Sequence, residues 1–214
     1  MSPNKMTARM TGKTTGPLEG SARDRLLAAA NELFYEEGVH TVGIERVIER
    51  AGVAKASLYS TFGSKEELIR AYLQQRADAR KRRISERIAR HDDPRDRILS
   101  VFDVLGERAS EPTWRGCAFI NVRAEGPRAE NKVTRLCAAT RGWMRGLFTE
   151  LARDAGVSDP ETLGGQLVVL YDGATVGTSM DDDLGAVKTA RAMAEALLDA
   201  QLAGPPAKRA AAKK

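Results

Sequence analysis

The stretch that decides the fold is Gly52-Val53-Ala54-Lys55-Ala56-Ser57-Leu58-Tyr59-Ser60-Thr61-Phe62-Gly63-Ser64-Lys65-Glu66-Glu67-Leu68. It predicts a turn at Gly52, a short helix over 55–62, a second turn at Gly63 and the start of a long helix. Ahead of it, apolar side chains mark one face of a helix over 44–51. Two short helices joined by a glycine turn are typical of a helix-turn-helix, which places its second helix in a DNA groove.

Helical periodicity continues on both sides of this pair. Apolar residues between 26 and 34 fall on one helix face, with Ser21 as the expected N-cap and Gly38 as the expected stop. Ser64 and Glu67 read as a capping box, in which Ser64 accepts from the Glu67 amide and Glu67 reaches back. These signals predict one helix before the pair and a long helix after it.

The rest of the chain predicts further helices and no strand of useful length. Asp93-Pro94 and Asp159-Pro160 each supply an N-cap followed by proline at the first helical position. Beyond residue 63 the helices are expected over about 64–90, 94–110, 116–125, 129–155, 160–180 and 184–203. We therefore predict an all-α fold of about nine helices.

Four segments differ in composition. We expect a disordered basic arm at 1–20, a three-helix helix-turn-helix domain at 21–66, a larger helical domain at 67–203 and a disordered basic tail at 204–214. Net charge is +6 over residues 1–90, −5 over 91–204 and +4 over 205–214. A basic N-terminal part beside an acidic body fits a protein that presents one end to a polyanion, although chance asymmetry on a solvated surface is the alternative.

Composition also bounds the location of the chain. No apolar run approaches the ~20 residues of a transmembrane helix, and the N-terminus lacks the apolar segment of a secretory signal. The two cysteines, Cys117 and Cys137, have no metal-type spacing. This usage fits a reducing cytoplasm better than a disulfide framework, so we expect a cytoplasmic protein with no membrane partner.

The helix over 55–62 carries side chains suited to the DNA major groove. Lys55 can donate to guanine O6 and N7, and Ser57 to several base edges, while small neighbours let the backbone approach the bases. The Tyr59 hydroxyl and the Lys65 ammonium can donate to phosphates. The residues predicted to contact DNA are Thr41, Arg46, Lys55, Ala56, Ser57, Tyr59, Ser60 and Lys65.

Each of these assignments has a structural alternative. Tyr59 and Phe62 could be aromatic residues of the core. Lys65 could be a lysine that lies in solvent without contacting DNA. For Arg46 the two interpretations, a DNA contact and an ordinary surface residue, are evenly balanced. The basic run at 80–83 is spread around all faces of a helix, so we expect it to be mainly solvated, with some electrostatic help to DNA approach.

Residues 21–75 resemble the N-terminal domain of the TetR family of bacterial transcriptional regulators. The resemblance rests on the Leu/Phe helix ending at Gly38, on the segment 44–53 and on the run from Leu58 to Leu68. It implies that Lys55, Ala56, Ser57, Tyr59 and Lys65 contact DNA. One position departs from the family, which commonly has Thr where this chain has Val42. The departure removes a usual helix cap and phosphate contact, so that Thr41 or Gly43 must substitute.

Large apolar and amphipathic side chains gather between residues 102 and 172, together with a few polar groups. Such a mixture is what a small-ligand pocket requires, and an ordinary helical core is the alternative. Residues 114–121 are also similar to a short helix close to the effector pocket in one branch of the TetR family. The predicted ligand-binding residues are Phe102, Leu105, Trp114, Cys117, Phe119, Asn121, Thr140, Trp143, Met144, Tyr171 and Asp172.

The last two predicted helices are rich in small residues, among them Gly164, Gly173 and Gly177. Small side chains allow close helix contact, and interleaved Leu, Val and Met supply apolar area. Two such helices from each of two subunits could pack as a two-fold, four-helix dimer interface. The sequence therefore predicts a homodimer through these helices. The resemblance implies the same, and a dimer would let two reading helices match an inverted repeat.

Catalytic chemistry is not indicated. His40 and His91 lie in predicted connections without a Ser or Cys partner pattern, and the acidic run at 181–183 reads as a loop beside a helix N-terminus that favours acids. We expect Cys117 and Cys137 to be buried free thiols, with a redox pair as the alternative. No enzyme activity, catalytic residue, metal site or cofactor is predicted.

Together these features predict a ligand-responsive TetR-type regulator. The hypothesis is a repressor that binds an inverted-repeat DNA operator as a dimer and is released by a small, apolar or amphipathic effector. Effector binding would move the long helix 64–90 and misalign the two reading helices. The alternatives are an activator of the same fold and a helical small-molecule-binding protein without DNA function.

Overall fold

The computed structural model describes residues 16–126 and 129–202, and these residues form nine α-helices and no strand. The helices are α1 (Ala22–Glu37), α2 (Ile44–Ala51), α3 (Lys55–Phe62), α4 (Lys65–Ile88), α5 (Pro94–Ala109), α6 (Ala118–Glu125), α7 (Lys132–Asp154), α8 (Pro160–Asp181) and α9 (Gly185–Leu202). The predicted all-α fold is confirmed, and every predicted helix bound lies within three residues of the observed one. The segments predicted to be disordered, 1–20 and 204–214, lie outside the described residues except for 16–20, where Leu18 packs on the helix-turn-helix core and the Gly16 carbonyl accepts from Arg50 at 3.2 Å.

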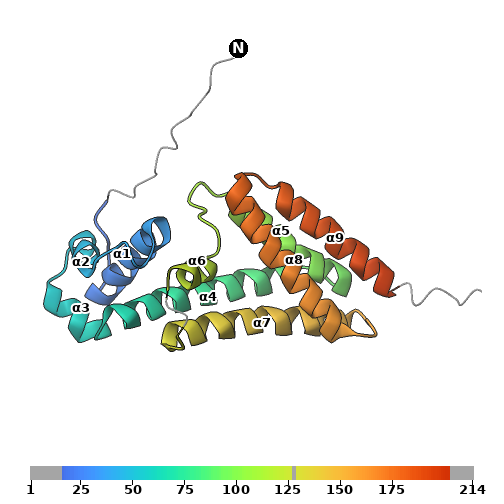
Figure 1. Cartoon of the computed structure of the whole chain (residues 1–214), viewed down its shortest axis with the longest axis horizontal. Helices are drawn as coiled ribbons and strands as arrows, with labels where there is room; N and C mark the ends of the chain where they lie inside the picture. The colour runs from blue at the N-terminus through green and yellow to red at the C-terminus, as the bar shows by residue number, and fades with distance from the viewer. Residues whose placement is uncertain (1–15, 127–128, 203–214) are drawn as a thin grey trace, which may run out of the picture.

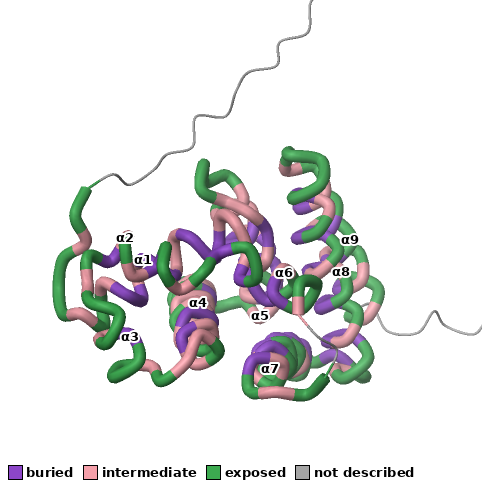
Figure 2. The backbone as a smooth tube through the Cα atoms, turned by 60° about the vertical axis from the view of Figure 1, so that its left-hand side comes forward, coloured by how far each residue is buried: buried purple, intermediate pink, exposed green. Residues whose placement is uncertain are grey.

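The nine helices form two groups joined by α4 (Figure 1). At one end, α1, α2 and α3 pack together around the start of α4. At the other end, α5 packs against the remainder of α4, α7 runs alongside α4 and packs against α5 and α8, and α9 packs against α5 and α8. The short α6 lies between the two groups. Buried residues lie toward the middle of each group, and exposed residues cover the outside (Figure 2).

Helix α4 contributes to both hydrophobic cores. Leu68, Tyr72, Leu73 and Ala77 belong to the core shared with α1–α3 and α6, and the fully buried Ile84 belongs to the core shared with α5, α7, α8 and α9. One continuous helix therefore links the helix-turn-helix mechanically to the larger helical body. Half-buried Leu18, ahead of α1, also packs on the first core.

The helix starts follow local capping chemistry. Ser21 forms a full capping box with Asp24, and Asp93 and Asp159 accept hydrogen bonds from the first turns of α5 and α8. The box predicted at Ser64 is half formed. Ser64 accepts from the Glu67 amide at 3.2 Å, but the Glu67 carboxylate instead accepts from Arg70 and from Lys132 of α7.

Helices α7 and α8 approach closely at Gly164, where an added Cβ would lie 2.9 Å from the Thr149 backbone nitrogen. We expect Gly164→Ala to lower the free energy of unfolding by about 1–3 kcal/mol, because the two backbones must separate. Gly146→Ala on α7 is the matched control, since nothing lies within 4 Å of its added Cβ. It should instead stabilise the protein by about 0.5–1 kcal/mol. Urea denaturation measures both values, and equal losses would contradict the close approach.

Candidate nucleic-acid interface and ligand cavities

Helices α2 and α3 form a tight helix-turn-helix. Helix α2 ends at Gly52, which has a left-handed backbone (φ 61°) that glycine adopts without strain. The buried Leu58 and half-buried Phe62 anchor α3 on the domain core. The opposite side of α3 is open, with Tyr59 46% exposed. Helix α3 therefore presents an outward face of the small and polar kind that fits a major groove.

The cations next to α3 are paired with acids. Lys55 Nζ lies 3.2 Å from Glu45 Oε1, and both side chains are exposed. Arg46 makes two hydrogen bonds to the Glu37 carboxylate, one of them 2.9 Å long, and these bonds raise the pKa of Arg46 above its usual value. Exposed ion pairs of this kind are weak, so a DNA phosphate or a base edge can replace the carboxylate.

The start of α2 shows how the chain accommodates Val42. Its side chain is fully buried, Thr41 is exposed, and Gly43 is the N-cap without a side-chain hydrogen bond. Val42 therefore works as a core residue, and Thr41 is the nearby hydroxyl left accessible to a phosphate.

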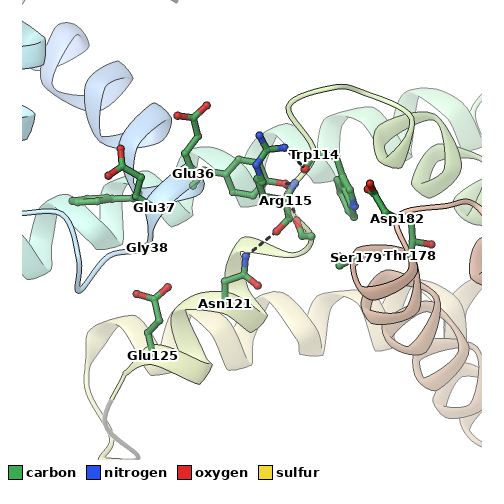
Figure 3. Close-up of a pocket in the computed structure, with 13 residues that line it drawn as sticks. Glu36, Glu37, Gly38, Trp114, Arg115, Asn121, Glu125, Thr178, Ser179 and Asp182 are labelled. Carbon is green, nitrogen blue, oxygen red and sulfur yellow. Dashed lines mark hydrogen bonds between the residues drawn. The ribbon is translucent and has the colours of Figure 1, made fainter. Parts of the chain in front are cut away.

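A first cavity of about 380 Å³ lies where the end of α1 meets the loop before α6 and the end of α8 (Figure 3). Trp114 and Thr178 stand on one side, and Glu37 and Glu125 on the other. The Trp114 Nε1 and Thr178 Oγ1 atoms are buried and have no hydrogen-bond partner among the described residues. Such orphaned polar atoms are costly unless water or a ligand satisfies them.

A second cavity adjoins the first, and a third adjoins the second. The second measures about 100 Å³ and is shared by α1, α4, α5, α6 and α8. The third measures about 760 Å³ and lies among α4, α6, α7 and α8. Trp114 lines both the first and the second cavity, and Phe119 lines both the second and the third. The body of the protein thus contains a chain of hollows next to α4.

Direct hydrogen bonds connect these cavities to the helix-turn-helix end of the molecule. The buried Tyr35 of α1 donates to the Gly116 carbonyl at 2.8 Å and accepts from the Arg115 amide at 3.0 Å. The His40 amide, between α1 and α2, donates to Glu125 of α6 at 3.1 Å. These hydrogen bonds would therefore transmit movement of the loop before α6 to α1.

Helices α8 and α9 present an apolar face to the outside. On α8, Val169 is 63% exposed, Val176 41% and Met180 79%, and on α9 Met193 is 51% exposed. Their α8 spacing, together with Gly173 between them, places these residues on one side of the helix. We call Val169, Gly173, Val176, Met180 and Met193 the α8–α9 apolar face.

The glycines of this region divide between two uses. A Cβ at Gly164 would meet α7, and one at Gly177 would lie 2.7 Å from Ala186 of α9, so both serve packing within the subunit. A Cβ at Gly173 would meet nothing within 4 Å. Of these three, Gly173 alone leaves room for close approach by a second molecule.

Comparison with known proteins places the chain in a family. A model for bacterial regulatory proteins of the tetR family matches residues 26–72. The crystal structure of a TetR-family transcriptional regulator from Streptomyces coelicolor is 33% identical, with a TM-score of 0.81 over 85% of this chain and 96% of that chain. This chain belongs to the TetR family.

Other relatives cover less of the sequence. The transcriptional activator FasR of Mycolicibacterium smegmatis is 38% identical over 39% of this chain and 38% of FasR. The transcriptional repressor NemR of Escherichia coli is 30% identical over 50% of this chain and 55% of NemR. The chain thus spans well under two thirds of these curated relatives. The reduced NemR structure, at 22% identity and a TM-score of 0.73, shares the fold.

Family membership confirms two predictions. This TetR-family protein is a DNA-binding transcriptional regulator of the helix-turn-helix class, and it is not an enzyme. Within the described residues no group of three or more His, Cys, Asp or Glu could hold a metal ion. None of the helices in residues 16–126 and 129–202 has the length and apolar character to cross a bilayer.

The residues predicted to contact DNA gather at one end of the TetR-family fold. Thr41, Arg46, Lys55, Ala56, Tyr59 and Ser60 are exposed, and Ser57 and Lys65 are half-buried. Ser60 Oγ donates to the Ser57 carbonyl at 3.2 Å, and the Lys65 ammonium lies 6.0 Å from the centre of the Phe34 ring.

The predicted ligand-binding residues do not converge on one pocket. Asn121 lines the first cavity and Trp114 the first and second; Leu105 and Tyr171 line the second and Phe119 the second and third; Cys117, Thr140, Met144 and Asp172 line the third. Phe102 and Trp143 line none of the three. Phe102 is fully buried against Phe148 and Tyr171, and Trp143 packs under the Lys81 ammonium.

The arginines of α4 were not predicted to take part in a site. Arg76, Arg80 and Arg83 line the second cavity, although the run at 80–83 was expected to be mainly solvated. Arg82 and Arg83 do follow that expectation, because both are exposed, although Arg83 also borders the second cavity; Arg80 is half-buried. The spacing of 76, 80 and 83 places the three arginines on one helix face, and this spacing was the available signal.

Both cysteines are free thiols, and Cys137 is buried. Burial raises the pKa of Cys137 to about 11. Since the thiolate is the reactive form, we expect iodoacetamide at pH 8 to modify Cys137 at least about 100-fold more slowly in the folded protein than in urea. Peptide mass spectrometry measures the rate, and similar rates in both states would contradict the burial.

Proposed function

We propose that this chain is a dimeric transcriptional repressor that binds an inverted-repeat operator through α3 and is released by a small molecule bound beside α4. The observation that carries the proposal is the sharing of α4 between the two cores. Leu68 to Ala77 pack with the helix-turn-helix, and Ile84 packs in the body that holds the cavities. A ligand that shifts α4 would shift α3 with it.

Dimerisation follows from how little DNA one α3 can read. A single eight-residue helix covers one half-site, and a two-fold pair covers an inverted repeat. The α8–α9 apolar face is the surface proposed to join the two subunits, because it is apolar, exposed and open at Gly173. It also lies away from α3 (Figure 1), which leaves both reading helices free.

Release requires the effector to bind the two conformations unequally. Two connections would carry movement from the cavities to the helix-turn-helix. One is α4 itself. The other is the Tyr35 hydroxyl, whose hydrogen bonds join α1 to the loop before α6. A ligand that enlarges the first or second cavity would displace this loop, and α1 would follow.

Whether the protein represses or activates transcription is a separate part of the proposal. The relatives include a protein named as an activator, FasR, and one named as a repressor, NemR. We propose repression by promoter blocking. Deletion of the gene beside a reporter separates the signs: reporter output rises for a repressor and falls for an activator.

Selection of bound sequences from a random duplex library tests operator binding. The selection is run at about 0.15 M salt, where nonspecific phosphate binding is weakened. Wild type should recover an inverted repeat, and a Tyr59→Ala, Lys65→Ala double variant should not. No enriched sequence from a folded dimer would refute operator binding by the free protein, and would favour a ligand-binding protein without DNA function.

A further inference from the structure

Four arginines surround the second cavity. Arg76, Arg80 and Arg83 stand at i, i+4 and i+7 on α4, and Arg108 reaches in from α5. The cavity of about 100 Å³ also touches Tyr35, Trp114 and Tyr171. Arg76, Arg80 and Arg108 are half-buried there, so their charges lose part of their hydration, whereas Arg83 is exposed at the edge of the cluster.

The partners of these arginines are mostly neutral. Arg76 Nε donates to the Asn31 side-chain oxygen Oδ1 at 2.9 Å, and its guanidinium stacks 3.5 Å from the centre of the Tyr35 ring. Arg80 donates to the Cys117 sulfur at 3.3 Å and lies 4.8 Å from the centre of the Phe119 ring. Neither interaction cancels a charge.

The acids nearby do not balance the cluster. Arg108 pairs with Glu111, and this is the one ion pair of the four arginines within the described residues. Asp172, which acts on Arg80 electrostatically, is paired with Arg141 at 2.9 Å. Burial lowers the pKa of Arg108, and repulsion from Arg83 and Arg76 lowers it further. The cavity therefore holds an excess of positive charge that an anion would offset.

The undescribed segments cannot supply the missing acid. Residues 1–15, 127–128 and 203–214 contain no Asp or Glu. These segments therefore add no carboxylate side chain to those of the described residues.

The walls around the arginines set the shape of the anion. A cavity of about 100 Å³ holds roughly a carboxylate and one or two waters, since a water occupies about 30 Å³ in the liquid. Past Phe119 lies the cavity of about 760 Å³, where Ile120, Cys137 and Met144 supply apolar surface. A small charged head and a larger apolar body fit this pair of spaces.

We infer that the second cavity binds the carboxylate of an amphipathic organic acid, with the head among Arg80, Arg83 and Arg108 and the apolar body extending past Phe119. The inference names the effector class for the proposed function and rests on that function. The head would satisfy guanidiniums on both α4 and α5, so its arrival would act directly on the helix that links the two cores.

Tryptophan fluorescence can test the assignment. The chain has two tryptophans, and Trp143→Phe leaves Trp114, which lines the second cavity, as the single reporter. We would titrate this variant with 4-phenylbutyrate against 4-phenyl-1-butanol, and with decanoate against 1-decanol. Within each pair the carbon skeleton is the same and the charge differs. At least one acid should give saturable binding that is tenfold or more tighter than its alcohol.

Charge-removing variants localise the head group. In the same background Arg80→Gln and Arg83→Gln should each weaken acid binding tenfold or more and leave alcohol binding unchanged. Arg82→Gln is the matched control, because it removes the same charge from the same helix at an exposed position. If Arg80→Gln fails to fold, Arg83→Gln alone decides, since Arg83 is an exposed residue whose replacement costs the fold little.

Three results would overturn the inference: no saturable change with either acid, equal affinity of acid and alcohol, or equal weakening by Arg82→Gln. Operator binding is measured in the same samples to separate this inference from the proposed function. Acid binding without loss of operator binding would refute release and leave the site intact. Operator binding without acid binding would refute the site and leave the regulator intact.

Discussion

Glutamate at Val169 and Met180 together should convert the dimer into folded monomers. Both side chains already lie in solvent on the isolated subunit, at 63% and 79% exposure, so their replacement costs the monomer fold little. In a two-fold seam each position occurs twice, and four carboxylates would be buried close to one another. Burial of unpaired like charges is strongly unfavourable.

Loss of the dimer should nearly abolish operator binding. Two linked half-site contacts exceed one by about 10²–10⁴ in affinity, because the second contact becomes intramolecular. We therefore expect the double variant to bind its operator at least about 100-fold more weakly than wild type. Sedimentation equilibrium measures the mass, and fluorescence anisotropy with a labelled operator measures the affinity.

Ala139→Glu is the matched control for this experiment. It places one such carboxylate, against two in the double variant, at an exposed position on α7, outside the α8–α9 apolar face. It should leave both mass and affinity unchanged. A double variant that remained dimeric and bound the operator normally would show that another surface joins the subunits.

Local sequence signals predicted the helices well because the events that begin and end them are local. Gly38, Gly52 and Gly63 each end a helix with a positive φ, of 92°, 61° and 78°. Ser21, like the aspartate of each Asp-Pro pair, satisfies amides within the next three residues. Such signals need no knowledge of the rest of the chain.

Features that depend on distant partners could not be predicted in this way. Glu67 was expected to cap α4. Its carboxylate instead accepts a hydrogen bond from Lys132, which lies 65 residues away along the chain. Gly164 and Gly177 were assigned to the seam between subunits, yet each fits a neighbouring helix of its own subunit. Periodicity shows that a residue points inward and leaves open which element it meets.

The ligand-binding residues show the same limit. Aromatic content predicted a pocket, but Phe102 packs with Phe148 and Tyr171 in the core. The arginines at 76, 80 and 83 are recognisable as one face of a helix, yet α5 and α6 must be in place before that face becomes a cavity. The outward face of α3 was easier to predict, because exposure on a short helix depends mostly on its own sequence.

Lys55→Ala should weaken operator binding and broaden the bases accepted at its position. A good lysine–guanine contact contributes about 1–3 kcal/mol of discrimination, which corresponds to roughly 10- to 100-fold for each half-site. In the free protein the Glu45 carboxylate is paired with the Lys55 ammonium, so DNA must displace the carboxylate before it can contact the lysine. Glu45→Gln should therefore act in the opposite direction, tightening binding a few-fold by removing both the competitor and a charge that repels phosphate.

Phosphate contacts should behave differently from base contacts. Tyr59→Phe and Lys65→Ala should weaken binding to all sequences about equally, because a phosphate carries no base identity. Lys65→Ala should also make binding less dependent on salt. Because the variant lacks one lysine–phosphate pair in each subunit, the dimer lacks two, and the slope of log K against log salt should fall in magnitude by about two.

Arg153→Ala serves as the control for the removal of a charge. This exposed arginine lies at the far end of α7 from α3, where it pairs with Glu161. Its removal should change neither the affinity nor the salt slope at about 0.15 M salt, since charges beyond a Debye length of about 8 Å are screened. If Lys65→Ala left the slope unchanged as well, Lys65 would be a packing residue on Phe34, and the backbone contacts would have to come from Tyr59, Thr41 and Arg46.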